Sequence, residues 1–95
     1  MRKVDKGVDL AKKLGIDPAR GIEAVIKAQL IAAVVDQVES QGITHSELAK
    51  KAKLPRSAVT GILSGSLQKV TIDRVLRLVE AVGLRPEIKL HKRVA

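Results

Sequence analysis

Residues 43–62, ITHSELAKKAKLPRSAVTGI, restrict the fold of this chain more than any other segment. Thr44 precedes Glu47 by three residues, the spacing at which a hydroxyl and a carboxylate cap the first N–H groups of a helix. A first helix is therefore expected to begin at His45. Pro55 marks the start of a second helix, since its φ angle is preset and the first turn does not need its missing N–H. The segment predicts two short helices in immediate succession.

The apolar residues of these two helices recur at helical spacing, so each helix has one inward face. The inward residues are Leu48, Ala49 and Ala52 in the first helix and Val59, Ile62 and Leu63 in the second. The small Ala49 allows close approach, which favours packing at a steep angle with the turn at Lys53 and Leu54. The outward residues of the second helix are Ser57, Thr60, Gly61 and Ser64. Such a slim, polar face without acidic residues is typical of a helix that enters the major groove of DNA.

Arg56 is the first candidate for contact with a base, because it stands at the N-terminal end of this outer face. Its guanidinium group can donate two hydrogen bonds to the acceptors of guanine in the major groove. Ser57 and Thr60 are its expected companions, and Gly61 would let the backbone approach the groove closely. The alternatives are an ordinary surface arginine at Arg56 and simple tolerance of a small exposed residue at Gly61.

Polar groups that flank the second helix are candidates for contact with DNA phosphates. They are His45 and Ser46 at the start of the first helix, Lys50 and Lys51 on its exposed side, and Ser66, Gln68 and Lys69 in the following loop. Each of them alone is equally an ordinary surface residue. The chain has 18 basic and 10 acidic residues, a net charge of +8, and the basic excess is marked over residues 44–70. Docking of a polyanion on this face is favoured over a merely solvated surface.

Composition excludes several other classes of protein. With 95 residues, 45% of them hydrophobic, the chain suits one small domain. It has no Phe, Tyr or Trp on which single-stranded nucleic acid stacks, so duplex DNA is the favoured partner. No cysteine, metal-ligand spacing or Gly-rich phosphate loop is present, so no enzyme activity, metal site or cofactor is expected. Neither a membrane span nor a signal peptide is visible, which predicts a cytoplasmic protein without a membrane partner.

The remaining segments predict an all-α fold, a compact bundle of four to five helices. A long helix is expected from Pro18, capped by Asp17, to about Gln41, with apolar residues on more than one side. A last helix is expected over residues 72–82. Its inward residues are Ile72, Val75, Leu76 and Val79. Residues 17–84 then form the domain, and residues 1–16 form an N-terminal extension that is flexible or a short helix.

Residues 85–95 are expected to form a short C-terminal β-strand and tail. Ile88 and Leu90 alternate with charged residues, which is the period of a strand. A single strand has no partner for its backbone groups, so the strand would pair with a second copy, with another protein or, in a frayed tail, with water. A homodimer with Ile88 and Leu90 at its interface would place two reading helices about one DNA turn apart, on a near-palindromic site.

The chain resembles the Cro/cI-type (XRE) helix-turn-helix family, and within it the HigA-like antitoxins of type II toxin–antitoxin pairs. The likeness extends over residues 17–91 through the segments KAQL, SELAKKAKL, SAVTGILSG, TIDRVLRLVEAVG and PEIKL. It implies a lambda-repressor-like fold, a C-terminal strand paired across the dimer, and a phosphate contact at His45, where the family usually has glutamine. Lys53 departs from the family, which usually has glycine there because this turn residue has a positive φ angle.

The resemblance also implies a function: repression of its own operon as a DNA-binding antitoxin, together with neutralisation of a ribonuclease-type toxin. The toxin contact is then expected in the first twenty residues, outside the DNA-reading unit. Its apolar candidates are Val8, Leu10, Leu14 and Ile16. The alternatives are a stand-alone XRE-family regulator and a toxin-masking module that binds DNA only weakly. A gene for a small basic ribonuclease beside this one would favour the antitoxin.

Overall fold

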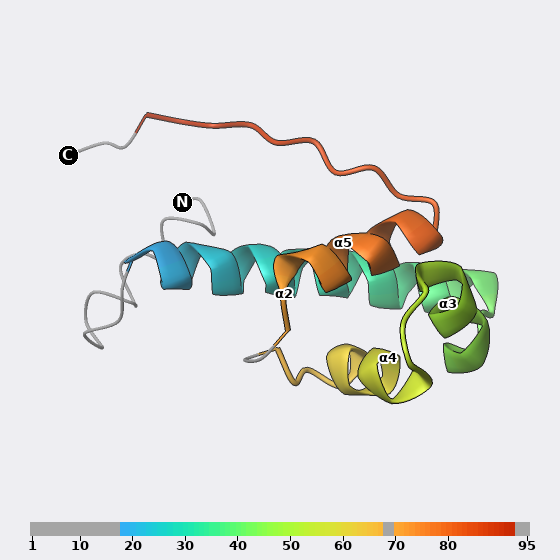
Figure 1. Cartoon of the computed structure of the whole chain (residues 1–95). Helices are drawn as coiled ribbons and strands as arrows, with labels where there is room; N and C mark the ends of the chain where they lie inside the picture. The colour runs from blue at the N-terminus through green and yellow to red at the C-terminus, as the bar shows by residue number, and fades with distance from the viewer. Residues whose placement is uncertain (1–17, 68–69, 93–95) are drawn as a thin grey trace.

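Four helices follow one another in the residues that the computed structural model describes, 18–67 and 70–92 (Figure 1). They are α2 (Pro18–Gln41), α3 (His45–Ala52), α4 (Arg56–Leu63) and α5 (Ile72–Ala81). The predicted all-α helix-turn-helix fold is confirmed, with helix boundaries within one residue of those expected. Pro55 is the N-cap of α4 rather than its first helical residue. Residues 1–16, including any short helix there, lie outside the described range.

The starts of α3 and α5 are fixed by threonine caps. The N–H of Glu47 donates to Oγ1 of Thr44 over 3.1 Å, and the N–H of Thr44 donates to Oε1 of Glu47 over 3.4 Å. The predicted capping box is therefore confirmed. At α5 the N–H of Arg74 donates to Oγ1 of Thr71 over 3.3 Å. Such a cap contributes about 1 kcal/mol to the stability of its helix.

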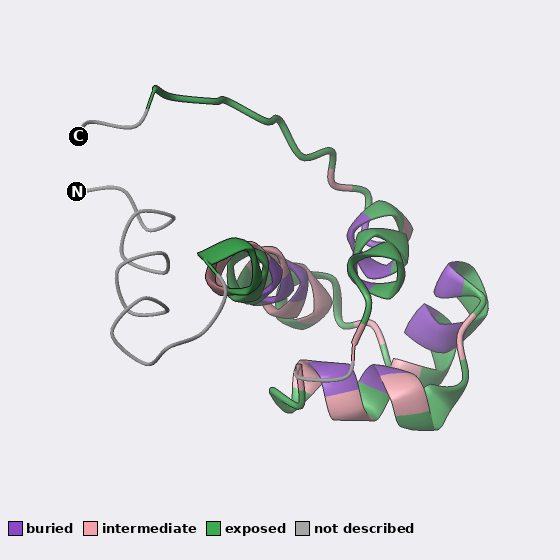
Figure 2. Cartoon of the chain, turned by 60° about the vertical axis from the view of Figure 1, so that its left-hand side comes forward, coloured by how far each residue is buried: buried purple, intermediate pink, exposed green. Residues whose placement is uncertain are grey.

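The core lies where α2 packs along α5 and where α3 contacts both α4 and α5. Figure 2 shows the buried segments of α3, α4 and α5 turned inward toward one another. The core residues are Ile31, Val34, Leu48, Ala49, Ala52, Val59, Ile62, Val75, Leu78, Val79 and Val82. Because α3 and α4 each bury one face in this core, the opposite face of α4 is left to solvent.

The buried face of α5 differs from the predicted one. Leu78 is fully buried, whereas Ile72 and Leu76 retain 36% and 40% of their surface exposed. Val75, Leu78 and Val79 are three and four residues apart and form one narrow stripe. The apolar arc of this helix is wider than the surface that α2 and α3 cover, so its edge remains exposed.

The long helix α2 buries a single stripe rather than several sides. Ile31 and Val34 lie in the core, and Lys27, one turn earlier, is also buried. Nζ of Lys27 is 3.1 Å from a carboxylate oxygen of Glu23, while its aliphatic stem continues the apolar stripe. The residues beside the stripe are only half-buried. No helix in the described part of the chain is long and apolar enough to cross a membrane.

All four described helices end with the same backbone hydrogen bond, which spans five residues. In α3 the N–H of Leu54 donates to the carbonyl of Ala49 over 3.0 Å, and Lys53 between them has φ 57° and ψ 45°. At the ends of α2, α4 and α5 the residue in this left-handed position is Gly42, Gly65 or Gly83. Lys53 thus has the positive φ angle that the resemblance implies for this turn position. A residue with a Cβ in this conformation costs roughly 1–2 kcal/mol.

Lys53→Gly is therefore expected to raise the free energy of unfolding by about 0.5–1 kcal/mol, since relief of the left-handed strain exceeds the added entropy of the unfolded chain. Urea unfolding followed by circular dichroism measures this change. Lys51→Gly is the matched control, because it places glycine inside α3 and should lower stability by roughly 0.5–1 kcal/mol. A loss of stability in both variants would contradict the assignment of strain to Lys53.

The predicted C-terminal strand is not formed in this chain. Residues 85–92 run as an extended segment clear of the helices (Figures 1 and 2), and no β-strand is present in the described ranges. Ile88 and Leu90 are 84% and 90% exposed. The alternating pattern favours an extended backbone, but a strand also needs a neighbour for its N–H and C=O groups, and none of the described residues provides one.

Candidate nucleic-acid interface

The exposed face of α4 contains the predicted base-contacting residues. Val59 and Ile62 anchor the helix in the core, while Arg56, Ser57 and Thr60 are exposed and Gly61 is half-buried. At about 100° per residue, these four positions fall within an arc of roughly 140°. The arc contains one arginine, two hydroxyl groups and no acidic side chain. It can donate hydrogen bonds to base edges without repelling phosphates.

The N-terminus of α4 is open to a partner, unlike the N-termini of α3 and α5. Its N-cap is Pro55, and no side chain accepts a hydrogen bond from the first turn. The first backbone N–H groups of a helix have no acceptor within the helix and carry a partial positive charge. Arg56, the first residue of the helix, adds a full positive charge there. Phosphate oxygens or base acceptors are suitable partners for this end of α4.

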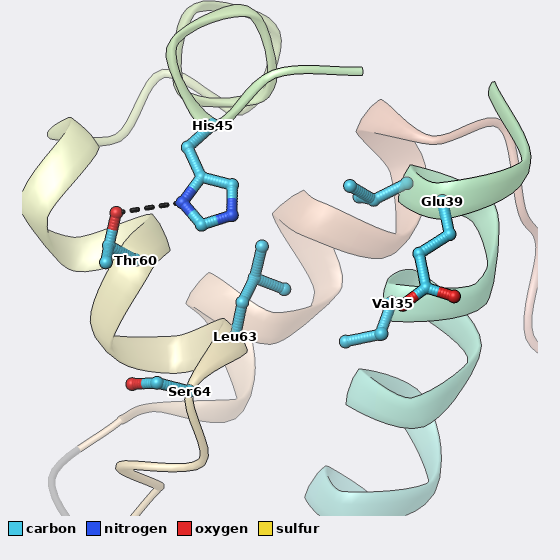
Figure 3. Close-up of a pocket in the computed structure, with 7 residues that line it drawn as sticks. Val35, Glu39, His45, Thr60, Leu63 and Ser64 are labelled. Carbon is cyan, nitrogen blue, oxygen red and sulfur yellow. Dashed lines mark hydrogen bonds between the residues drawn. The ribbon is translucent and has the colours of Figure 1, made fainter. Parts of the chain in front are cut away.

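One hydrogen bond joins a predicted phosphate-contacting residue to a predicted base-contacting residue. Nδ1 of His45, the first residue of α3, lies 3.0 Å from Oγ1 of Thr60 in the middle of α4. Figure 3 shows the imidazole ring directed at the hydroxyl group. Sequence reasoning missed this pair, because 15 residues separate the two positions and only the crossing angle of α3 and α4 brings them together.

A shallow groove of about 280 Å³ opens beside this pair, between α2, α3 and α4. Figure 3 shows His45, Thr60 and Leu63 on one side and Val35 and Glu39 on the other. The full lining is Val35, Val38, Glu39, His45, Thr60, Leu63 and Ser64. The hydroxyl of Ser64 donates to the carbonyl of Gly61 over 2.9 Å and is therefore engaged within its own helix.

The residues predicted to contact phosphates occupy different parts of the surface. His45 and Ser46 lie at the N-terminal end of α3, whereas Lys50 and Lys51 lie in its last turn. Ser66 is exposed in the loop after α4, and Gln68 and Lys69 lie outside the described residues. His45 thus contacts α4 through Thr60, while the two lysines lie in the last turn of α3, just before the turn that leads into α4.

Lys51 belongs to a second, more basic groove of about 530 Å³ at the C-terminal ends of α3 and α5. It is lined by Lys51, Ala52, Lys53, Arg77, Glu80 and Ala81. Nε of Arg77 is 3.2 Å from Asp73, so part of its charge is neutralised. Lys53 and Arg77 were not predicted to lie together, because nothing in their spacing along the sequence indicates that the two helix ends meet.

The residues predicted to contact a toxin are not tested by the structure. Val8, Leu10, Leu14 and Ile16, proposed as a toxin contact, lie outside the described residues. Within the described ranges, no three His, Cys, Asp or Glu side chains gather as a metal site would require.

Comparison with known proteins gives one match. The model of a family described as "Helix-turn-helix domain" matches residues 11–91, which include all four described helices. No curated protein and no solved structure matches the chain.

Proposed function

Because the chain belongs to the helix-turn-helix domain family, we propose that it is a sequence-specific repressor that binds double-stranded DNA with α4 in the major groove. The observation that supports this most is the exposed, acid-free face of α4, whose opposite face is fixed by the buried Val59 and Ile62. A recognition helix needs both properties, because its polar groups must be held rigidly while they meet the base edges.

Charge and composition support a duplex partner. The net charge of +8 favours association with a polyanion, and phosphate contacts provide most of the non-specific affinity of DNA-binding proteins. The absence of Phe, Tyr and Trp disfavours single strands, which are usually held by stacking on aromatic rings. In the proposed role the protein binds and has no catalytic activity.

Fluorescence anisotropy on the DNA upstream of its own gene, compared with a scrambled duplex at physiological salt, tests this proposal. A specific repressor should prefer its operator by roughly a thousandfold or more. Saturation at two chains per site would support a dimer. Equal, weak binding to both duplexes would contradict the proposal and leave protein interaction as the main role.

The proposed repressor acts as a homodimer joined through residues 85–92. In this segment Ile88 and Leu90 alternate with charged residues and are almost fully exposed, and its backbone pairs with no strand among the described residues. Pairing with the same segment of a second copy would satisfy the backbone groups and cover both side chains. Two-fold symmetry would then match a near-palindromic operator.

Deletion of residues 85–95 is expected to convert the dimer to a monomer in analytical ultracentrifugation, because the paired strands and their apolar face are lost. The double variant Ile88→Asp, Leu90→Asp should have the same effect, since two charges would face each other across the pair. The double variant Glu87→Ala, Lys89→Ala, on the opposite face, should remain dimeric. An unchanged mass after the deletion would place the interface on the helices.

The resemblance to HigA-like antitoxins supports a second proposed role for the same chain, as the antitoxin that neutralises a ribonuclease-type toxin and represses the shared operon. The alternatives are a stand-alone XRE-family regulator and a toxin-masking module with weak DNA binding. The first observation to make is whether a gene for a small basic ribonuclease adjoins this one. Co-expression should then restore growth and yield a co-purifying pair, whereas unrelieved toxicity would favour the stand-alone regulator.

A further inference from the structure

The hydrogen bond between His45 and Thr60 gives α4 a feature beyond general DNA binding. Within the described residues, no other side-chain hydrogen bond joins α3 to α4. Thr60 is exposed in the middle of the recognition face, and Nδ1 of His45 is 3.0 Å from its Oγ1. The histidine is thus placed to control how this hydroxyl group meets a base.

A hydroxyl group can donate one hydrogen bond and accept others, so its partner decides which capacity remains free. A neutral imidazole with its proton on Nε2 accepts at Nδ1, and the threonine proton is then used within the protein. A charged imidazolium donates from both ring nitrogens. The threonine oxygen must then accept from Nδ1–H, and its own O–H is free to point outward.

We propose that the protonation state of His45 selects the base edge that Thr60 recognises, and that the operator preference of this protein therefore changes with pH. This rests on the proposed function as a DNA-binding repressor. With neutral His45, Thr60 presents an acceptor and fits the amino group of adenine or cytosine. With charged His45, Thr60 presents a donor and fits the O6 or N7 of guanine or the O4 of thymine. Histidine side chains ordinarily change charge between about pH 5 and 8.

Few other groups in the described part of the groove could take part in the hydrogen bond between His45 and Thr60. From α2, Glu39 is the one ionisable residue that lines the same groove, together with the apolar Val35 and Val38. The α4 residues that line the groove are Thr60, Leu63 and Ser64. The Ser64 hydroxyl already donates its proton to the carbonyl of Gly61.

Two more charged groups belong to the helices that the pair joins. On α3, Glu47 is engaged in the capping box with Thr44, accepting from its N–H and from its hydroxyl. On α4, Arg56 stands one turn before Thr60 at the start of the helix. Neither of them provides Thr60 with another hydrogen-bond partner.

The charge gained by His45 has a second effect that must be separated from the first. A positive group at the start of α3 would strengthen binding to every duplex, since it is expected near a phosphate. A rise in affinity at low pH therefore does not test whether the Thr60 hydroxyl changes its role. A change in preference at one base pair of each half-site is specific to the hydroxyl exchange.

The experiment is selection from a randomised duplex library at about pH 5 and about pH 8, the two ends of the interval over which histidine side chains ordinarily change charge. At one base pair the preferred base should change from one that presents an amino group to one that presents only acceptors. Since one hydrogen bond is exchanged, the preference should change by roughly three- to tenfold. Thr60→Val, which keeps the shape but lacks the hydroxyl, should show the same preference at both pH values. Ser64→Ala, which removes a hydroxyl already bonded to the carbonyl of Gly61 within α4, should retain the change.

Three results would overturn the inference, and they separate it from the proposed function. An operator motif that is identical at both pH values removes the inference and leaves the repressor intact. A pH-dependent change in base preference that persists in Thr60→Val would have to come from a group other than the Thr60 hydroxyl. The third result would come from nitrogen NMR of the free protein. If Nδ1 of His45 carries a proton at about pH 8, it donates to Thr60 in both charge states, and the Thr60 hydroxyl then does not switch from acceptor to donor. Failure to select any motif at either pH would remove the proposed function together with this inference.

Discussion

Leu78→Ala is expected to lower the free energy of unfolding by about 2–5 kcal/mol, because the truncation leaves a cavity among fully packed neighbours. Leu78 has no exposed surface and lies between Val75 and Val79 on the stripe of α5 that packs against α2 and α3. Small domains have only about 5–15 kcal/mol of stability in total. Urea unfolding monitored at the helical circular dichroism band should show a much lower midpoint.

Leu76→Ala on the same helix is the matched control. The side chain is identical, but 40% of the surface of Leu76 is exposed. Its removal should cost less than about 1 kcal/mol, because it leaves an edge and no cavity. Equal losses in the two variants would mean that α5 is rotated relative to the face described above.

Arg56→Ala is expected to reduce affinity for the operator by about 1–3 kcal/mol, the discrimination that a well-placed arginine gives against a wrong base. Preference at one base pair should relax at the same time. The reason is the place of Arg56 at the open N-terminus of α4, on the exposed face. Fluorescence anisotropy on the operator and on a scrambled duplex measures both effects.

Lys50→Ala removes the same charge and separates base contact from phosphate contact. Lys50 is exposed in the last turn of α3 and is not one of the residues on the exposed face of α4. Its loss should weaken the operator and the scrambled duplex alike and reduce the salt dependence by about one phosphate contact. If Arg56→Ala also weakens both duplexes equally, Arg56 does not recognise a base.

The elements that sequence predicted well are those determined by neighbouring residues. The capping box of Thr44 and Glu47 and the proline before α4 both depend on interactions within five residues. Such signals are local and are therefore visible in the sequence. The exposed face of α4 was predicted for the same reason, since helical periodicity alone separates Thr60 from the buried Val59.

Features that depend on distant parts of the chain were missed or misplaced. Leu76 and Leu78 are chemically identical, and only the position of α2 and α3 decides which one is buried. The contact between His45 and Thr60 requires the crossing angle of α3 and α4, which periodicity does not contain. Residues 85–92 have a strand pattern without a strand, because pairing requires a partner outside the described chain.

The uncapped start of α4 implies a compromise between the stability of the helix and the proposed binding of DNA. A serine or aspartate side chain at position 55 would accept a hydrogen bond from one N–H of the first turn, as Thr44 and Thr71 do from Glu47 and Arg74, and would add about 1 kcal/mol of stability. That donor would then be occupied before any DNA arrived. With Pro55 at this position that stability is absent, and a donor at the start of α4 is available to the proposed DNA ligand, as is common where function and maximal stability conflict.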